Sequence, residues 1–296
     1  MNNSSHKQNA HNVIKKLLLA LLLYPSIVFC ANNPYILYTG HQAGMFSTFL
    51  MTVGLLDGYD KGEYAGVEVR LGKDELYYDA AHGPNWWEYY FSPINTERDP
   101  WTPTTPLTPS ISQYVSRQGQ SALSRKRCHH LIHKYITIKP EILRQVDAFI
   151  QANIHGEKLI GIHYRATDKF TSEAEQISPE MVCAKVREVL LNIQNDKVKI
   201  FVATDSAPFL QKMKNSFGAK VIFFDMKRSP DNVPIHMNKQ IDGYTRGKWA
   251  LLDCLMLSKC DLLVRTSSNL SNVSMLFNPA VPVIRLNNPR WGGVDR

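Results

Sequence analysis

The stretch from Lys158 to Asp168, which reads KLIGIHYRATD, decides the fold. Its first seven residues are mostly apolar or β-branched, which is typical of a short buried strand, and charged residues follow immediately. Similar strands are predicted at 198–203, 220–224, 261–264 and 281–284, and helices at 179–195, 208–217, 244–258 and 269–277. This alternation predicts βαβ units, a parallel sheet, and ligands bound at the carboxyl ends of its strands. The second half of the chain is therefore expected to be a Rossmann-like α/β domain.

The first half is less regular, but it contains a partial βαβ unit. A strand at 35–38 is followed by the turn Gly40 to Gly44, a helix at 45–56 and a strand at 67–71. Further predicted elements are a Pro-rich loop at 100–109, a basic helical segment at 112–134 and an amphipathic helix at 140–154. We predict a leader at 1–31 and two domains at 32–155 and 156–296.

Length and composition are those of a folded globular chain with more basic than acidic residues. The 296 residues are 44% hydrophobic and 20% charged, with a formal net charge of +8, which excludes a disordered or fibrous protein. Three of these charges (Lys7, Lys15 and Lys16) precede the apolar stretch from Leu17 to Ala31, a pattern typical of a secretory signal peptide. An uncleaved membrane anchor is the alternative.

The leader contains no acidic residue, so the rest of the chain carries +5, which argues against nucleic acid as a partner. We expect a location in the lumen of the secretory pathway (ER or Golgi), or export to the periplasm or beyond. A membrane is an expected partner only if the leader is retained.

Four cysteines lie outside the leader: Cys128, Cys183, Cys254 and Cys260. An even number in an oxidising compartment permits two disulfides. Cys183 and Cys254 fall within apolar helical patterns, where buried free thiols are more usual, so no bridge is predicted.

Charged residues follow the strand at 158–164 at once. Arg165, Asp168 and Lys169 occupy the edge of the sheet where ligands bind, and the planar fork of arginine suits bidentate contact with phosphate oxygens. An ion pair between Arg165 and Asp168 that closes the turn is the alternative interpretation.

Two further strands end in polar residues at predicted helix starts. Asp205 and Ser206 precede the helix at 208–217, where they suit an N-cap, an anion site, or both. The run Arg265 to Asn269 (RTSSN) opens the next such helix, and capping by Ser268 alone accounts for only one of its polar residues.

Other motifs are weaker. His129 and His133 share one helix face, a spacing able to hold a metal, but no acidic residue lies between them, and a solvated basic helix is favoured. The run GYTRGK at 243–248 lacks the spacing of a P-loop.

Three segments resemble, in order and spacing, the motifs of the GDP-fucose-dependent fucosyltransferases. They are GIHYRATDK (161–169), VATD (202–205) and YTRGKWALLDCLMLSKCDLLVRTSSNLS (244–271). The α1,6-fucosyltransferases, including the rhizobial nodulation enzyme, are most similar, and the protein O-fucosyltransferases are related. The resemblance covers about 140–277 and implies a GT-B-like fold of two Rossmann-like domains, with the donor bound mainly by the C-terminal one.

The resemblance also implies roles for individual residues. Arg165 would bind the β-phosphate and stabilise the leaving GDP, and Glu173 would be the general base, with a solvated loop residue as the alternative for Glu173. The remaining implied donor-binding residues are His163, Asp205, Asp253, Ser267, Ser268, Asn269, Gly40 and Gly44, and the implied acceptor-site residues are Asp168 and Lys169.

The expected reaction is inverting transfer of fucose from GDP-β-L-fucose to a hydroxyl of a glycan or glycoprotein, with no metal and no cofactor. The sequence departs from the family pattern at Ala166, where the α1,6 enzymes carry a second arginine, and at Ser206, where a second aspartate is usual. These departures leave open a different acceptor or a different GDP-sugar. A catalytically silent protein that binds nucleotide sugars or glycans on the same fold is the alternative.

Overall fold

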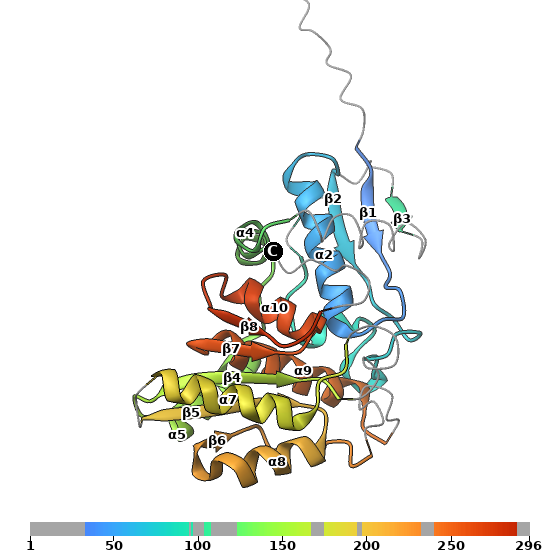
Figure 1. Cartoon of the computed structure of the whole chain (residues 1–296). Helices are drawn as coiled ribbons and strands as arrows, with labels where there is room; N and C mark the ends of the chain where they lie inside the picture. Colours follow the sequence, from blue (N-terminus) through green and yellow to red (C-terminus); the bar gives the residue numbers. More distant parts are fainter. Residues whose placement is uncertain are drawn as a thin grey trace, which may run out of the picture. The chain divides into compact units, whose positions relative to one another are not determined.

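A computed structural model of the chain describes residues 33–94, 96, 104–107, 123–166, 175–193, 197–231 and 240–288 (Figure 1). The described residues from Pro34 onward belong to one compact unit. The predicted boundary between two domains at 155/156 stays a prediction.

The C-terminal sheet has five parallel strands, in agreement with the sequence prediction. They are β4 (Lys158–Tyr164), β5 (Val198–Thr204), β6 (Val221–Ile222), β7 (Leu262–Arg265) and β8 (Val283–Arg285). The order across the sheet is β6-β5-β4-β7-β8. The chain therefore winds outward from β4 in both directions, as in a doubly wound Rossmann sheet, and its ligand crevice is expected where the winding reverses, between β4 and β7.

Helices cover both faces of this sheet. They are α5 (Pro140–Asn153), α7 (Pro179–Ile193), α8 (Ala207–Phe217), α9 (Gly243–Ser258) and α10 (Asn269–Phe277). Along β4, Ile160 and Ile162 pack with α7 and α8, whereas Leu159 belongs to the core cluster that contains α9 and α10. Because side chains alternate along a strand, His163 lies on the same face as Leu159.

A second parallel sheet lies in the N-terminal half. It comprises β1 (Tyr35–Tyr38), β2 (Gly66–Val69) and β3 (Thr104–Leu107), in the order β2-β1-β3. The third strand corrects the prediction of an irregular loop at 100–109. Proline lacks the N–H that a central strand needs, but β3 is an edge strand, where proline is tolerated.

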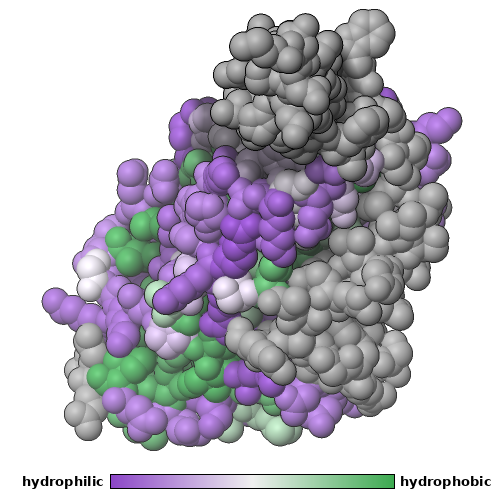
Figure 2. Space-filling view, turned by 90° about the horizontal axis from the view of Figure 1, so that it is seen from above, coloured by the Kyte–Doolittle hydropathy of each residue, from purple (hydrophilic) through white to green (hydrophobic). Residues whose placement is uncertain are grey.

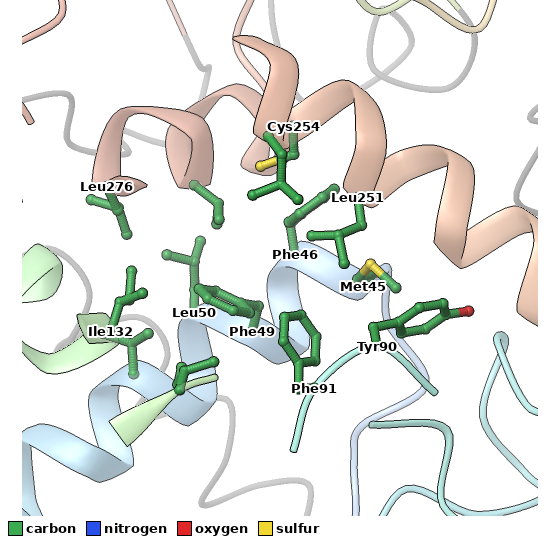
Figure 3. Packing of buried hydrophobic residues seen from close by; sticks show 14 of the residues in the cluster. Met45, Phe46, Phe49, Leu50, Tyr90, Phe91, Ile132, Leu251, Cys254 and Leu276 are labelled. Carbon is green, nitrogen blue, oxygen red and sulfur yellow. The ribbon is translucent and has the colours of Figure 1, made fainter. Parts of the chain in front are cut away.

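Helix α2 (Met45–Asp60) is buried along most of its length and carries the largest hydrophobic cluster. Figure 3 shows its aromatic residues Phe46 and Phe49 between Tyr90 and Phe91 on one side and the helices that carry Leu251 and Leu276 on the other. The core therefore joins the N-terminal half to α9 and α10.

Helix α4 (Arg125–Tyr135) is attached to the C-terminal end of α2 by ion pairs. Arg127 contacts Asp57 at 2.8 Å and Asp60 at 2.7 Å, and Lys134 contacts Asp60 at 2.6 Å. His129 bonds the carbonyl of Leu276 at 2.9 Å. The basic segment thus packs against α2 and α10, and among the described residues no three His, Cys, Asp or Glu side chains are grouped to hold a metal.

The glycines of GYTRGK permit close packing of α9. A Cβ on Gly243 would lie 2.6 Å from the backbone of Tyr77, and one on Gly247 would lie 2.7 Å from the ring of Tyr90. These glycines have a packing role, consistent with the prediction that the run is not a P-loop.

The four cysteines outside the leader are all buried and free. Large exposed hydrophobic residues in the described part of the chain are few (Leu143, Met181 and Leu191). The face shown in Figure 2 is mostly hydrophilic where described residues are drawn, with apolar residues gathered at its lower left. Over the same residues, we find no helix whose length and apolar content would allow it to cross a membrane.

Candidate functional site

The candidate site lies where β4 and β7 end. These strands are neighbours, and His163 on β4 is in register with Arg265 on β7. Their backbones remain tied beyond this point, because the Thr266 amide donates to the His163 carbonyl at 3.0 Å. Residues on both strand ends therefore share one edge of the sheet.

Arg165, one residue beyond β4, is held by both of its neighbouring strands. Its backbone N–H donates to Oγ1 of Thr266 at 3.0 Å, and its Nε lies 3.2 Å from Oδ2 of Asp205. The carboxylate of Asp205 also accepts from the Ala166 amide at 3.1 Å. These contacts orient the guanidinium at the edge of the sheet.

The sequence left open whether Asp205 and Ser206 cap α8, form an anion site, or do both. In the structure the two residues make different contacts. Ser206 caps α8, accepting from the Phe209 amide at 3.2 Å, so its hydroxyl serves the helix. Asp205 instead faces Arg165 and is 9% exposed at its side chain. The predicted contact of Asp205 with the donor stays a prediction, but its position gives it a clear effect on Arg165.

The polar run after β7 forms the N-terminus of α10. Ser268 is the N-cap residue, and its side chain makes no capping hydrogen bond. The Asn272 amide donates to the carbonyl of the N-cap residue Ser268 at 3.0 Å. In an α-helix, the amides that precede this one have no intrahelical acceptor and face the N-terminal end. Ser267 is fixed differently, because its amide donates to Oδ1 of Asn287 at 2.7 Å. This N-terminus favours an anion.

Arg265 is fully buried, with 0% exposure, and its guanidinium donates to Oδ1 of Asn272 on α10 at 2.7 Å. Its register places it on the α10 face of β7, where it joins the strand to the helix.

Asp253 is a buried carboxyl on α9 beside this edge, with 8% exposure. Its Oδ1 has no hydrogen-bond partner among the described residues. The pKa of Asp253 is raised to about 7, chiefly by burial; the positive charge of Arg228 opposes the rise and the negative charge of Asp205 adds to it. These interactions place Asp253 within electrostatic reach of Asp205, so α9 contributes to the same site.

Arg228 was not identified from the sequence. It lies beyond β6, donates to the carbonyls of Met226 at 3.0 Å and Phe224 at 2.9 Å, and stacks over Phe223 at 5.2 Å from the ring centre. Burial lowers its pKa, and Asp253 opposes that change. Several residues separate Arg228 from the end of β6 at Ile222, so a search for charges directly after a strand does not find it.

The turn Gly40 to Gly44 connects β1 to α2. Gly40 has φ +94° and Gln42 has φ +53°, both in the left-handed region. Gly44 is the N-cap of α2. Within the described residues, the turn is in contact with Glu75, as described below.

Three predicted site residues, Asp168, Lys169 and Glu173, lie outside the described residues. The structure thus brings together His163, Arg165, Asp205 and the α10 N-terminus, with Asp253 alongside.

Comparison with known families identifies the same segments. The profile of the family "Nodulation protein Z (NodZ)" matches residues 124–294, more than half of the chain. The chain belongs to the NodZ family. This membership confirms the resemblance drawn from the three motifs.

Among curated proteins, NodZ of Bradyrhizobium diazoefficiens is 25% identical over 168 residues. That match covers 53% of the chain and 45% of the relative, so the sequence similarity spans less than half of NodZ's length.

Two groups of solved structures share the fold. NodZ α1,6-fucosyltransferase soaked with GDP-fucose has a TM-score of 0.59 at 16% identity, covering 86% of this chain and 95% of that one. POFUT1 in complex with GDP has a TM-score of 0.51 at 11% identity, covering 86% and 99%. The predicted GT-B-like α/β fold with parallel sheets is therefore confirmed.

Proposed function

We propose that this NodZ-family chain is a glycosyltransferase that transfers L-fucose from GDP-β-L-fucose to a hydroxyl of a glycan or glycoprotein. The carrying observation is the position of Arg165, oriented by Asp205 and Thr266 next to the N-terminus of α10. The relatives support the choice of donor, since NodZ was solved after soaking with GDP-fucose and POFUT1 with GDP.

In the proposed reaction, the chain stabilises the charge that develops on GDP. As the bond between the anomeric carbon and the β-phosphate oxygen breaks, its electron pair moves to that oxygen. A fixed guanidinium and helix N-terminal amides stabilise such a charge without reorganising, which is the largest single contribution in many enzymes. Arg165 and the residues Ser267, Ser268 and Asn269 are the groups we assign to this task.

Asp253 and His163 are assigned to the nucleoside. An ionised Asp253 accepts hydrogen bonds, and guanine offers two neighbouring donors, its N1–H and its exocyclic amine. The open Oδ1 of this buried carboxyl supports the assignment.

Glu173 is assigned as the base, with Asp168 and Lys169 beside the acceptor. Glu173 would take the proton of the acceptor hydroxyl while the hydroxyl oxygen bonds to the anomeric carbon from the face opposite GDP, which inverts the configuration. Such assistance is worth on the order of 10² to 10⁴ in rate. We propose that no metal takes part, and activity in excess EDTA tests this.

Calorimetry with GDP, GDP-fucose and GDP-mannose, combined with donor hydrolysis, tests the proposed function. Arg165→Ala should abolish turnover and weaken GDP binding, and Arg165→Lys should restore little because lysine lacks the bidentate fork. Arg70→Ala is the matched control, since Arg70 is 62% exposed and pairs with Glu68 on the surface.

Each result has one consequence. Binding without any turnover identifies the silent nucleotide-sugar binder, preference for GDP-mannose corrects the donor, and absence of GDP binding refutes the proposed function. A panel of glycans and glycopeptides with labelled GDP-fucose then identifies the acceptor.

We also propose that residues 1–31 direct the chain into a secretory or export pathway. N-terminal sequencing of the protein recovered from that compartment should find cleavage between Val28 and Asn32. An intact leader on membrane-bound protein would instead identify an anchor.

A further inference from the structure

Glu75 places a buried carboxyl directly beneath the turn Gly40 to Gly44. Only 9% of Glu75 is exposed, although glutamate side chains are rarely buried in proteins. Its Oε1 accepts from the Gln42 amide at 2.9 Å, a contact that spans 33 residues of sequence. Its Oε2 is also buried and has no hydrogen-bond partner within the described part of the chain.

The turn is shaped around this carboxyl. A Cβ on Gly40 would lie 2.5 Å from Cδ of Glu75, so the backbone comes as close as a glycine allows. Gln42 is the one non-glycine residue with positive φ in the described chain, and its amide is the group that Glu75 binds. A non-glycine residue in this region carries a conformational cost, so an outside contact is needed to hold it.

The residues after Glu75 attach the same segment to α9. The Leu76 carbonyl accepts from Nη2 of Arg246 at 2.8 Å. The backbone of Tyr77 approaches Gly243 so closely that a Cβ there would lie 2.6 Å away. Tyr90 adds a hydrogen bond to the Tyr244 carbonyl at 2.8 Å. Glu75 therefore begins a segment fixed at one end to the turn and at the other to the helix that carries Asp253.

We propose that Glu75 is a positioning residue for donor binding, which fixes the turn Gly40 to Gly44 in its binding conformation and ties it to α9. This inference rests on the proposed function, because it takes the turn as part of the GDP-fucose site. The hydrogen bond from the Gln42 amide to Glu75, rather than the negative charge of the carboxylate, is what holds the turn.

The surroundings of Glu75 agree with a hydrogen-bonding role. Burial raises the pKa of its carboxyl, the charge of Asp74 raises it further, and the Gln42 amide opposes the rise. The pKa of Tyr38 is raised by burial and by the nearby Glu75, so this phenol also interacts with the carboxyl. Glutamine has nearly the same shape as glutamate and still offers the Gln42 amide an oxygen acceptor.

The test uses three variants of the full chain: Glu75→Ala, Glu75→Gln and, as the control, Asp74→Asn. Asp74 is the exposed neighbour, so its variant removes one charge without touching the turn. Hydrogen exchange of 38–47 reports the turn, calorimetry with GDP reports binding, and GDP-fucose hydrolysis gives KM and kcat. Melting temperature, with the exchange of α7 and α8, checks that the rest of the chain is folded.

We expect Glu75→Ala to speed exchange at Gln42 and to raise the KM for GDP-fucose at least tenfold, while exchange in α7 and α8 is unchanged. Glu75→Gln should restore both values to within threefold, and Asp74→Asn should match the wild type. A folded Glu75→Ala with wild-type KM, or a Glu75→Gln as impaired as Glu75→Ala, overturns this inference alone. A wild-type chain without affinity for GDP overturns the proposed function and this inference with it.

Discussion

Affinity for the guanine base should depend on pH through Asp253, and this dependence can be worked out from the structure. An ordinary aspartate is fully ionised between pH 6 and pH 8, so it would contribute no change in that range. The pKa of Asp253 is raised to about 7 as the net effect of burial, which is the largest cause, of Arg228, which opposes the rise, and of Asp205, which adds to it. With this pKa, we expect about half of the Asp253 carboxyls to be protonated at pH 7 in the absence of nucleotide.

The hydrogen-bond donors of guanine determine whether its affinity rises or falls with pH. Its N1–H and exocyclic amine are both donors, so only the ionised carboxylate accepts both, and binding must expel the proton. With a pKa of about 7, roughly 90% of Asp253 is ionised at pH 8 and roughly 10% at pH 6. We expect binding about tenfold weaker at pH 6 than at pH 8, about 1.4 kcal/mol, with a plateau above pH 8.

Calorimetry with guanosine from pH 6 to pH 8 measures this directly, because guanosine has no phosphate to titrate in the same range. GDP is measured in parallel, and inosine diphosphate, which lacks the exocyclic amine, reports one lost hydrogen bond. A bond to a charged group is worth about 1.5–3 kcal/mol, so inosine diphosphate should bind roughly 10- to 150-fold more weakly at pH 8.

Asp253→Asn provides the control. It should bind GDP at least about 100-fold more weakly at pH 8, with no pH dependence from this position. The unliganded variant should also be more stable than the wild type at high pH. For an acid whose folded pKa is raised, the stabilising contribution is present below the unfolded pKa and is lost as pH rises toward about 7.

Raising the pKa of an ordinary aspartate, about 3.9, to about 7 is worth on the order of 4 kcal/mol, so the difference in melting temperature between variant and wild type should grow from pH 4 to pH 8. A flat guanosine affinity between pH 6 and pH 8, or an Asp253→Asn variant that binds GDP as tightly as the wild type, would refute the assignment of Asp253 to the base.

Three further predictions concern stability. Gly243→Ala should destabilise the fold by about 1–3 kcal/mol in urea unfolding, because the new Cβ would lie 2.6 Å from the backbone of Tyr77. The control Gly72→Ala should change the free energy of unfolding by less than about 0.5 kcal/mol, because a Cβ there has nothing within 4 Å. Ser206→Ala should cost about 1 kcal/mol through loss of the α8 cap, and Ser206→Asp, which can also cap, should restore most of it. Lys134 and Tyr135 hold the pKa of Asp60 well below its usual range, so stability should fall as pH drops below about 4, and Asp60→Asn should reduce that slope in urea midpoints from pH 6 to pH 3.

Local patterns predicted the C-terminal half well because its information is local. The run at 158–164 is apolar on both faces of a buried parallel strand, and β4 has these same bounds. The helix at 269–277 begins after polar capping residues, and α10 has the predicted bounds. Since the carboxyl ends of parallel strands share one edge, placing Arg165, Asp205 and the α10 N-terminus together needed only the order of the elements.

The contacts that complete the site were not predictable in this way, because they join distant parts of the chain. Glu75 lies 33 residues from Gln42, and Leu76 lies 170 residues from Arg246. Nothing near Glu75 in the sequence marks it as buried, and a charged residue in the polar run GKDEL favours a solvated loop. β3 was not predicted because its proline argues against a strand in the sequence. Proline is nevertheless tolerated there, because β3 lies at the edge of the sheet.

At Ala166 the sequence departs from the family pattern, and the structure shows which contacts of Arg165 this departure affects. Asp205 binds the amide of residue 166 and the Nε of Arg165, so its carboxylate holds Arg165 whatever side chain residue 166 carries, provided that residue 166 is not proline. Ala166 is only 8% exposed and packs in the cluster that contains Ile177 and Tyr164. A buried methyl group there can pack against this cluster, whereas an arginine would need an exit for its charged head. Loss of the second arginine therefore leaves the geometry of Arg165 intact, and its consequences should fall on the choice of sugar or acceptor rather than on the binding of GDP.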